Sequence, residues 1–159
     1  MILRTLVATA LTGLMLLNLG CAKRDLSEEL ADVKKNRALW QQQNITDYSI
    51  FTVHSCALCP RSDLEVIITV KNSAMFSVQD SGRTDQVRFT VTAEQTKSFL
   101  TVDDLFNKIE DAIKLRVEAL EVIYDSTYGF PTRLFIDYSK NSMDDEITIS
   151  NRTRIMSTN

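Results

Sequence analysis

The spacing of apolar residues predicts a helix that begins at Leu26. Further apolar side chains follow at intervals of four, three and seven residues, at Leu30, Val33 and Trp40, and charged residues occupy the other faces. The polar run Gln41–Asn44 ends the pattern. We therefore expect one amphipathic helix with a single apolar stripe.

Short runs of β-branched and aromatic residues predict strands after this helix. The runs are Tyr48–Val53, Leu64–Val70, Ala74–Val78 and Val87–Val91. In the second run every second residue is apolar, as in a half-buried antiparallel strand. Because Asn72–Ala74 is a tight-turn candidate, we expect the second and third runs to pair as a hairpin.

A second helix is predicted after residue 100. Thr101 is followed three residues later by Asp104, a variant of the capping box, and acidic residues at this end suit the helix dipole. A wide apolar stripe then runs through Val102, Leu105, Phe106, Ile109, Ala112, Ile113 and Val117. Such a stripe indicates a helix that packs into the core.

The last third of the chain predicts three more strands. Leu120–Tyr124 and Thr132–Ile136 flank the sequence YDSTYGFP, whose Gly129 and Pro131 favour a hairpin turn. The last strand takes Ile147, Ile149 and Ile155 to one face and Arg152 and Arg154 to the other. The order of elements predicts an α+β fold, an antiparallel sheet of about six to seven strands with two helices packed on one face.

Composition agrees with one globular domain. The 159 residues are 44% hydrophobic and 25% charged, with only four glycines and two prolines. The 18 basic and 21 acidic residues are mixed along the chain, which gives a net charge of −3. Since no basic stripe is present, we do not expect nucleic acid to be a partner.

The first twenty residues have the pattern of an export signal. Arg4 supplies a positive start, and a mainly apolar run from residue 6 to residue 19 follows. The run is shorter than the ~20 apolar residues that span a bilayer, so a retained transmembrane anchor is the second choice. We expect residues 1–20 to be a signal peptide and residues 21–159 to form a single α+β envelope domain with a short N-terminal tether.

Gly20 and Cys21 at the end of this run resemble a bacterial lipobox, in which the cysteine is lipidated and becomes the new N-terminus. Ala22 resembles the signal that sorts lipoproteins to the outer membrane of a Gram-negative bacterium. Asn18 stands where the pattern usually has leucine, so a type I signal peptide cut nearby is the alternative. The expected partner of the N-terminus is therefore the membrane, reached through a lipid on Cys21.

The segment HSCALCPRS holds Cys56 and Cys59 at C-x-x-C spacing beside His54, the only histidine. A thioredoxin-like catalyst needs this motif at the start of a helix, but strand periodicity follows it here. A closed zinc site needs four ligands, and there is no second pair of cysteines or histidines. We expect a disulfide between the two cysteines at a turn between strands, with no metal and no cofactor.

Acidic residues gather near the predicted ends of the last strands. They are Asp125, Asp137, Asp144, Asp145 and Glu146. Carboxylate oxygens in this arrangement could hold calcium, although no EF-hand spacing is present and a solvated loop is the alternative. We take His54, Asp137, Asp144, Asp145 and Glu146 as a candidate surface for a ligand or a partner.

Several motifs together look like a family of small bacterial lipoproteins that is described only as a domain of unknown function. The motifs are Trp40, NITDYS at 44–49, CALCP at 56–60, TVDDLF at 101–106, YDSTYGFPTRLFID at 124–137 and DDE at 144–146. The most specific part is YGFPT-x-x-x-ID followed by DDE. The resemblance implies a single domain in the cell envelope and carries over no catalytic residue.

The chain lacks G-x-S-x-G, Walker and H-E-x-x-H motifs, and we expect it not to be an enzyme. The expected function is a non-catalytic binding or structural role at the envelope, with an envelope protein or a ligand as the partner. Two alternatives stay open. One is a periplasmic thiol-disulfide oxidoreductase that uses Cys56 and Cys59, and the other is a proteinaceous inhibitor.

Overall fold

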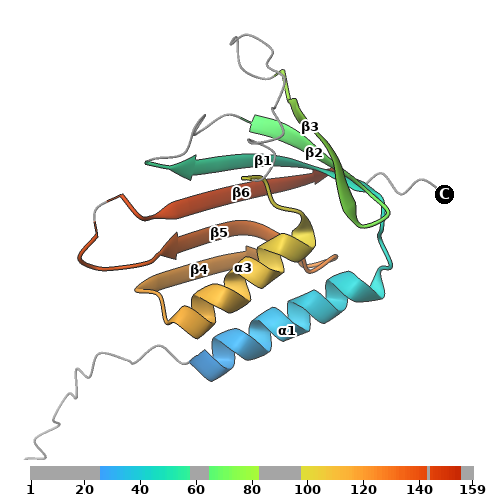
Figure 1. Ribbon diagram of the computed structural model, residues 1–159. Helices are drawn as coiled ribbons and strands as arrows, with labels where there is room; N and C mark the ends of the chain where they lie inside the picture. The colour runs from blue at the N-terminus through green and yellow to red at the C-terminus, as the bar shows by residue number, and fades with distance from the viewer. Residues whose placement is uncertain (1–25, 58–64, 83–97, 143, 155–159) are drawn as a thin grey trace, which may run out of the picture.

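The computed structural model describes residues 26–57, 65–82, 98–142 and 144–154 (Figure 1). Its elements are α1 (Leu26–Gln42), β1 (Tyr48–Cys56), β2 (Glu65–Lys71), β3 (Ala74–Asp80), α3 (Val102–Leu115), β4 (Ala119–Tyr124), β5 (Pro131–Asp137) and β6 (Ile147–Arg154). The described strands form one antiparallel sheet of six strands in the order β3-β2-β1-β6-β5-β4. The expected α+β class is confirmed, and the expected strand Val87–Val91 lies outside the described residues.

The sheet consists of two three-stranded meanders, each of which follows a helix. β1, β2 and β3 are consecutive neighbours, as are β4, β5 and β6, and the two meanders meet where β1 pairs with β6. That pairing runs from Ser49 opposite Arg154 to Cys56 opposite Ile147. β1 extends three residues beyond the predicted Tyr48–Val53, because the backbone groups of these residues pair with β6, a strand distant in sequence.

The hairpin between β2 and β3 forms as the sequence predicts. Asn72 and Ser73 have φ values of 50° and 61°, as the two central residues of a type I′ turn require. Two hydrogen bonds to the loop before β1 stabilise this turn. Asn72 N–H donates to Asp47 Oδ1 at 2.8 Å, and Ser73 N–H donates to Thr46 O at 2.9 Å. The NITD stretch therefore has a structural role at the end of the hairpin.

Helix α3 begins with the predicted capping box. The Thr101 side chain accepts from Asp104 N–H, and the Asp104 side chain accepts from Thr101 N–H. A further cap comes from the sheet, because Tyr48 Oη accepts from Val102 N–H at 3.0 Å. The helix ends at Arg116, which is left-handed with a φ of 54°, so Val117 lies beyond the helix although it is buried as expected.

The core contains buried apolar residues from both described helices and from the sheet. In the register of the strands, Ile50, Ile68, Leu134 and Ile149 share a face, and all four are nearly inaccessible to solvent. Trp40 of α1 contacts the sheet residue Tyr48 edge to face, with ring centroids 5.3 Å apart. None of the helices in the described part of the chain is long and apolar enough to cross a membrane.

Candidate functional site

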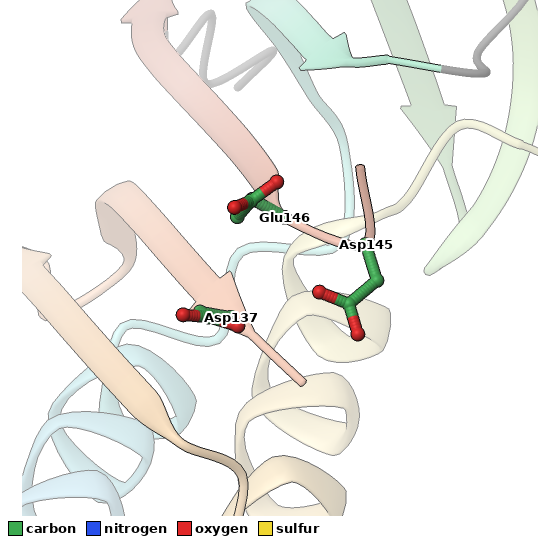
Figure 2. A group of neighbouring side chains, drawn as sticks. All are labelled: Asp137, Asp145 and Glu146. Carbon is green, nitrogen blue, oxygen red and sulfur yellow. The ribbon is translucent and has the colours of Figure 1, made fainter. Parts of the chain in front are cut away.

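The structure brings three of the predicted acidic residues together at one end of the sheet. Ile136 of β5 pairs with Ile147 of β6, so the next residue of one strand, Asp137, faces the preceding residue of the other, Glu146. Asp145 completes the group, as Figure 2 shows. One carboxylate oxygen of each residue lies within 4.8 Å of the others.

The chemistry of this acidic group is that of a hard-cation ligand set. Three carboxylates supply the oxygen atoms that calcium prefers, and they are the described residues that could hold a metal. Asp137 Oδ1 also accepts from Ser139 N–H at 3.2 Å, so part of this carboxylate stabilises the turn that leaves β5. Asp145 Oδ1 is buried and has no hydrogen-bond partner among the described residues.

Two other predicted acidic residues do not join the group. Asp144 is exposed and has a φ of 74°. Asp125 lies at the opposite end of β4 and β5, where its Oδ1 accepts from the N–H groups of Thr127 and Tyr128. Asp125 lies at a strand end, as expected, but away from the acidic group, because in an antiparallel hairpin the turn and the free ends of the two strands lie at opposite ends of the strands.

His54 lies in β1, opposite Ile149 of β6, and is not part of the acidic group. It is half-buried, and burial, with a smaller contribution from the positive charge of Lys108, lowers its pKa below the usual value. Lys108 Nζ in turn donates to Tyr138 Oη at 3.1 Å. The lowered pKa of His54 favours the neutral form of its side chain.

Cys56 is the last residue of β1 and is disulfide-bonded. Cys59 and Cys21 lie outside the described residues, so the predicted pairing of Cys56 with Cys59 and the lipidation of Cys21 stay predictions. The position of Cys56 at a strand end differs from the helix start that thioredoxin-like chemistry requires.

A pocket of about 130 Å³, which the sequence did not predict, lies between α1, α3 and β4. Its apolar lining comes from Val33, Ile109, Ile113, Leu120 and Val122. Its polar lining consists of Glu29 and Asp32 from the first half of α1 and Tyr124 from the end of β4.

Tyr124 is one of the residues that line this pocket. Its ring stacks on Phe106 of α3, with centroids 6.3 Å apart and an interplanar angle of 14°. Its hydroxyl oxygen is buried and has no hydrogen-bond partner among the described residues. Burial, together with the negative charge of Asp32, raises the pKa of Tyr124 well above its usual value, so the hydroxyl stays protonated.

The signals for this pocket in the sequence are weak. Glu29 and Asp32 are three residues apart and so share a helix face, but a charged pair at this spacing is common on solvated helices. Tyr124 is distant from both in sequence, and only the packing of β4 beside α1 and α3 brings the three residues to one cavity.

Comparison with known proteins supports the placement in a family and gives no activity. Neither the curated proteins nor the solved structures contain a match to this chain. The profile of a family of unknown function, DUF6174, matches residues 32–153. This range includes most of α1, all of α3, nearly the whole sheet, the acidic group and most of the pocket lining. The chain is a member of this family.

Proposed function

We propose that the protein is an exported, lipid-anchored protein of the cell envelope whose domain has a non-catalytic binding role. The observation that carries the proposal is the N-terminal sequence, in which a positive start and an apolar run end at Gly20 and Cys21. The outer membrane of a Gram-negative bacterium is the proposed location, since Ala22 follows the cysteine.

The start of the folded domain is compatible with an anchor at this cysteine. Helix α1 begins at Leu26, five residues after Cys21. Because an extended residue spans about 3.4 Å, a lipid on Cys21 would keep the first turn of α1 within roughly 17 Å of its attachment point. The domain would therefore lie close to the membrane surface with the beginning of α1 facing it.

The side chains that gather in the structure favour binding over catalysis. The acidic group offers three carboxylates, and the pocket is lined by Glu29, Asp32, Tyr124 and an apolar wall. Neither set includes a serine, a cysteine or a histidine beside its carboxylates, so neither contains a nucleophile paired with a histidine base.

Metabolic labelling tests the anchor. The full-length chain is expressed in a Gram-negative host that is fed an alkyne fatty acid, and labelling is compared between the wild type, Cys21→Ser and the matched control Cys56→Ser. We expect the wild type and the control to be labelled and Cys21→Ser to be unlabelled. Label that persists in Cys21→Ser would exclude lipidation at this cysteine.

A further inference from the structure

The outer edge of β4 is regular. In the described sheet β4 is the last strand, and β5 is its one neighbour (Figure 1). The register of this pair is unbroken from Ala119 to Ile123, and the strand contains neither proline nor lysine. Bulges, prolines and lysines are common features that keep an edge strand from pairing with another chain. The backbone on this side of β4 is therefore suited to pairing with an extended chain.

The strand at the other end of the described sheet, β3, is irregular. Thr69 of β2 pairs with Ser77, whereas the next residue, Val70, pairs with Met75, so Phe76 is an extra residue in β3. A bulge of this kind bends a strand and interrupts its ladder of hydrogen bonds. Of the two strands at the ends of the described sheet, β4 is thus the better template for an added strand.

The inner side chains of β4 are incompletely covered. Leu120 and Val122 lie opposite Ile136 and Leu134 of β5, so the four residues share one face of the sheet. The two β5 residues are fully buried, whereas Leu120 and Val122 are half-buried and line the pocket between α1, α3 and β4. The pocket volume of about 130 Å³ is close to that of an engineered cavity of about 150 Å³ that holds benzene. One aliphatic side chain from an added strand therefore fits beside β4.

The outer side chains of β4 indicate the charge of the partner. Glu121 and Ile123 lie on the face opposite the pocket, and both are exposed. None of the ion pairs among the described residues includes Glu121. If two copies of the chain paired in antiparallel fashion about the centre of this edge, Glu121 would face its own counterpart, and like charges directly opposite are destabilising. A basic side chain at that point would be stabilising, which favours a different protein over a second copy.

We propose that the edge of β4 binds an extended segment of a partner protein as an additional strand, with an aliphatic side chain in the pocket and a basic side chain opposite Glu121. Backbone hydrogen bonds would supply affinity, and the alternation of aliphatic and basic residues would supply specificity. The inference rests on the binding role proposed above and not on the lipid anchor. Failure of the fatty-acid labelling would leave it intact, and failure of peptide binding would leave the anchor intact.

The probe is the synthetic peptide acetyl-STVKVTS-amide, titrated into the ¹⁵N-labelled full-length chain in non-ionic detergent and followed by NMR. In a strand its two valines share one face and its lysine lies on the other. We expect saturable shifts of the amides of Leu120, Val122 and Ile123, with a Kd on the order of 1 mM for so short a segment. The control acetyl-SVTKTVS-amide has the valines on the lysine face. It should bind about tenfold more weakly, because no valine then enters the pocket when the lysine faces Glu121.

Methylation of the peptide backbone tests the strand pairing itself. In an antiparallel pair the N–H groups of alternate residues face the partner strand, and those between them face away. One peptide therefore carries N-methyl groups on both valines, and a second carries them on both threonines. We expect one of the two peptides to lose binding and the other to retain it.

Two variants of the protein locate the binding. Glu121→Gln should weaken binding about threefold, because it removes one exposed charge pair across the strands. Val122→Phe, which places a larger side chain in the pocket, should abolish it. The matched control is Asp111→Asn, an exposed acid on α3 that is not part of the pocket lining, which should leave Kd unchanged. The exposed Glu121→Gln substitution should keep the native spectrum, so the comparison remains decisive even if Val122→Phe unfolds the chain.

Three results would overturn the proposal. The first is the absence of saturable shifts in β4 with acetyl-STVKVTS-amide. The second is equal binding of the two N-methylated peptides, which would exclude backbone pairing. The third is a concentration-dependent shift of the β4 amides without any peptide, which would assign this edge to a second copy of the chain.

Discussion

Gly129 lies directly against the backbone carbonyl of Asn36. A Cβ atom at Gly129 would be 2.4 Å from the oxygen of Asn36, and Gly129 has a φ of 79°, in the left-handed region. The hairpin between β4 and β5 therefore docks on α1 at a position that only glycine can occupy. This contact gives the YGFP motif a structural role, with Phe130 buried beside Trp40 at a ring separation of 6.1 Å.

Substitution of Gly129 by alanine should strongly destabilise the protein. The expected loss in the free energy of unfolding is about 3 kcal/mol, from the positive φ and from a clash with an immobile backbone atom. Gly82→Ala is the matched control, since Gly82 also has a positive φ, 68°, but no atom of the described residues lies within 4 Å of its added Cβ. It should cost only about 1 kcal/mol. Urea unfolding measures the free energy of unfolding of both variants, and equal losses in Gly129→Ala and Gly82→Ala would show that the contact with Asn36 is unimportant.

Ser73→Gly should stabilise the hairpin between β2 and β3. Ser73 has a φ of 61°, and a type I′ turn with glycine at its second central position is the most favourable two-residue hairpin loop. The backbone N–H of residue 73, which donates to Thr46 O, is kept. We expect a gain of about 0.5–1 kcal/mol in the free energy of unfolding, measured by urea unfolding. A loss of stability would contradict the turn geometry.

Stability should decrease as the pH rises above 10. Burial raises the pKa of Tyr48 to about 12 from a usual value of 10.0. Between these two values the unfolded chain releases the proton and the folded chain retains it, so the unfolded state is favoured as the pH increases. Tyr124 contributes in the same direction.

The variant Tyr48→Phe separates the contribution of Tyr48 to this pH dependence from that of Tyr124. The variant should be less stable than the wild type at pH 8 by about 1–2 kcal/mol, because Val102 N–H loses its acceptor. Its stability should then decrease less steeply between pH 10 and pH 12. The measurement is urea unfolding at several pH values, and an unchanged slope in the variant would disagree with a raised pKa at Tyr48.

The disulfide at Cys56 should be structural. Cys56 is the last residue of a strand and not the first residue of a described helix, where a dipole would stabilise its thiolate, so a reduction potential below about −300 mV is expected. Equilibration with dithiol redox buffers measures the potential, and peptide mapping without reduction identifies the partner, which we predict to be Cys59. A potential between about −120 and −270 mV would instead favour the oxidoreductase alternative.

Local patterns predicted most of the elements, because capping and alternation act over a few residues. Thr101 and Asp104 form the predicted capping box, and Val66 and Ile68 are buried as their alternation indicates. The end of β1 at Cys56 was not predictable, since it depends on pairing with β6, about ninety residues away.

The two candidate sites also differ in how far the sequence could predict them. Asp137 and Glu146 flank neighbouring strands, so their proximity follows from the order of elements. The pocket around Tyr124 requires the tertiary packing of α1, α3 and β4, which no short pattern in the chain encodes.

The most direct test of the proposed function is mass spectrometry of the intact protein and its N-terminal fragment after purification from host membranes. The lipid-anchor proposal predicts a mature chain that begins at Cys21, lacks residues 1–20 and carries the additional mass of acyl groups on that cysteine. A chain that retains Met1, or that begins near residue 21 without acyl groups, would contradict it.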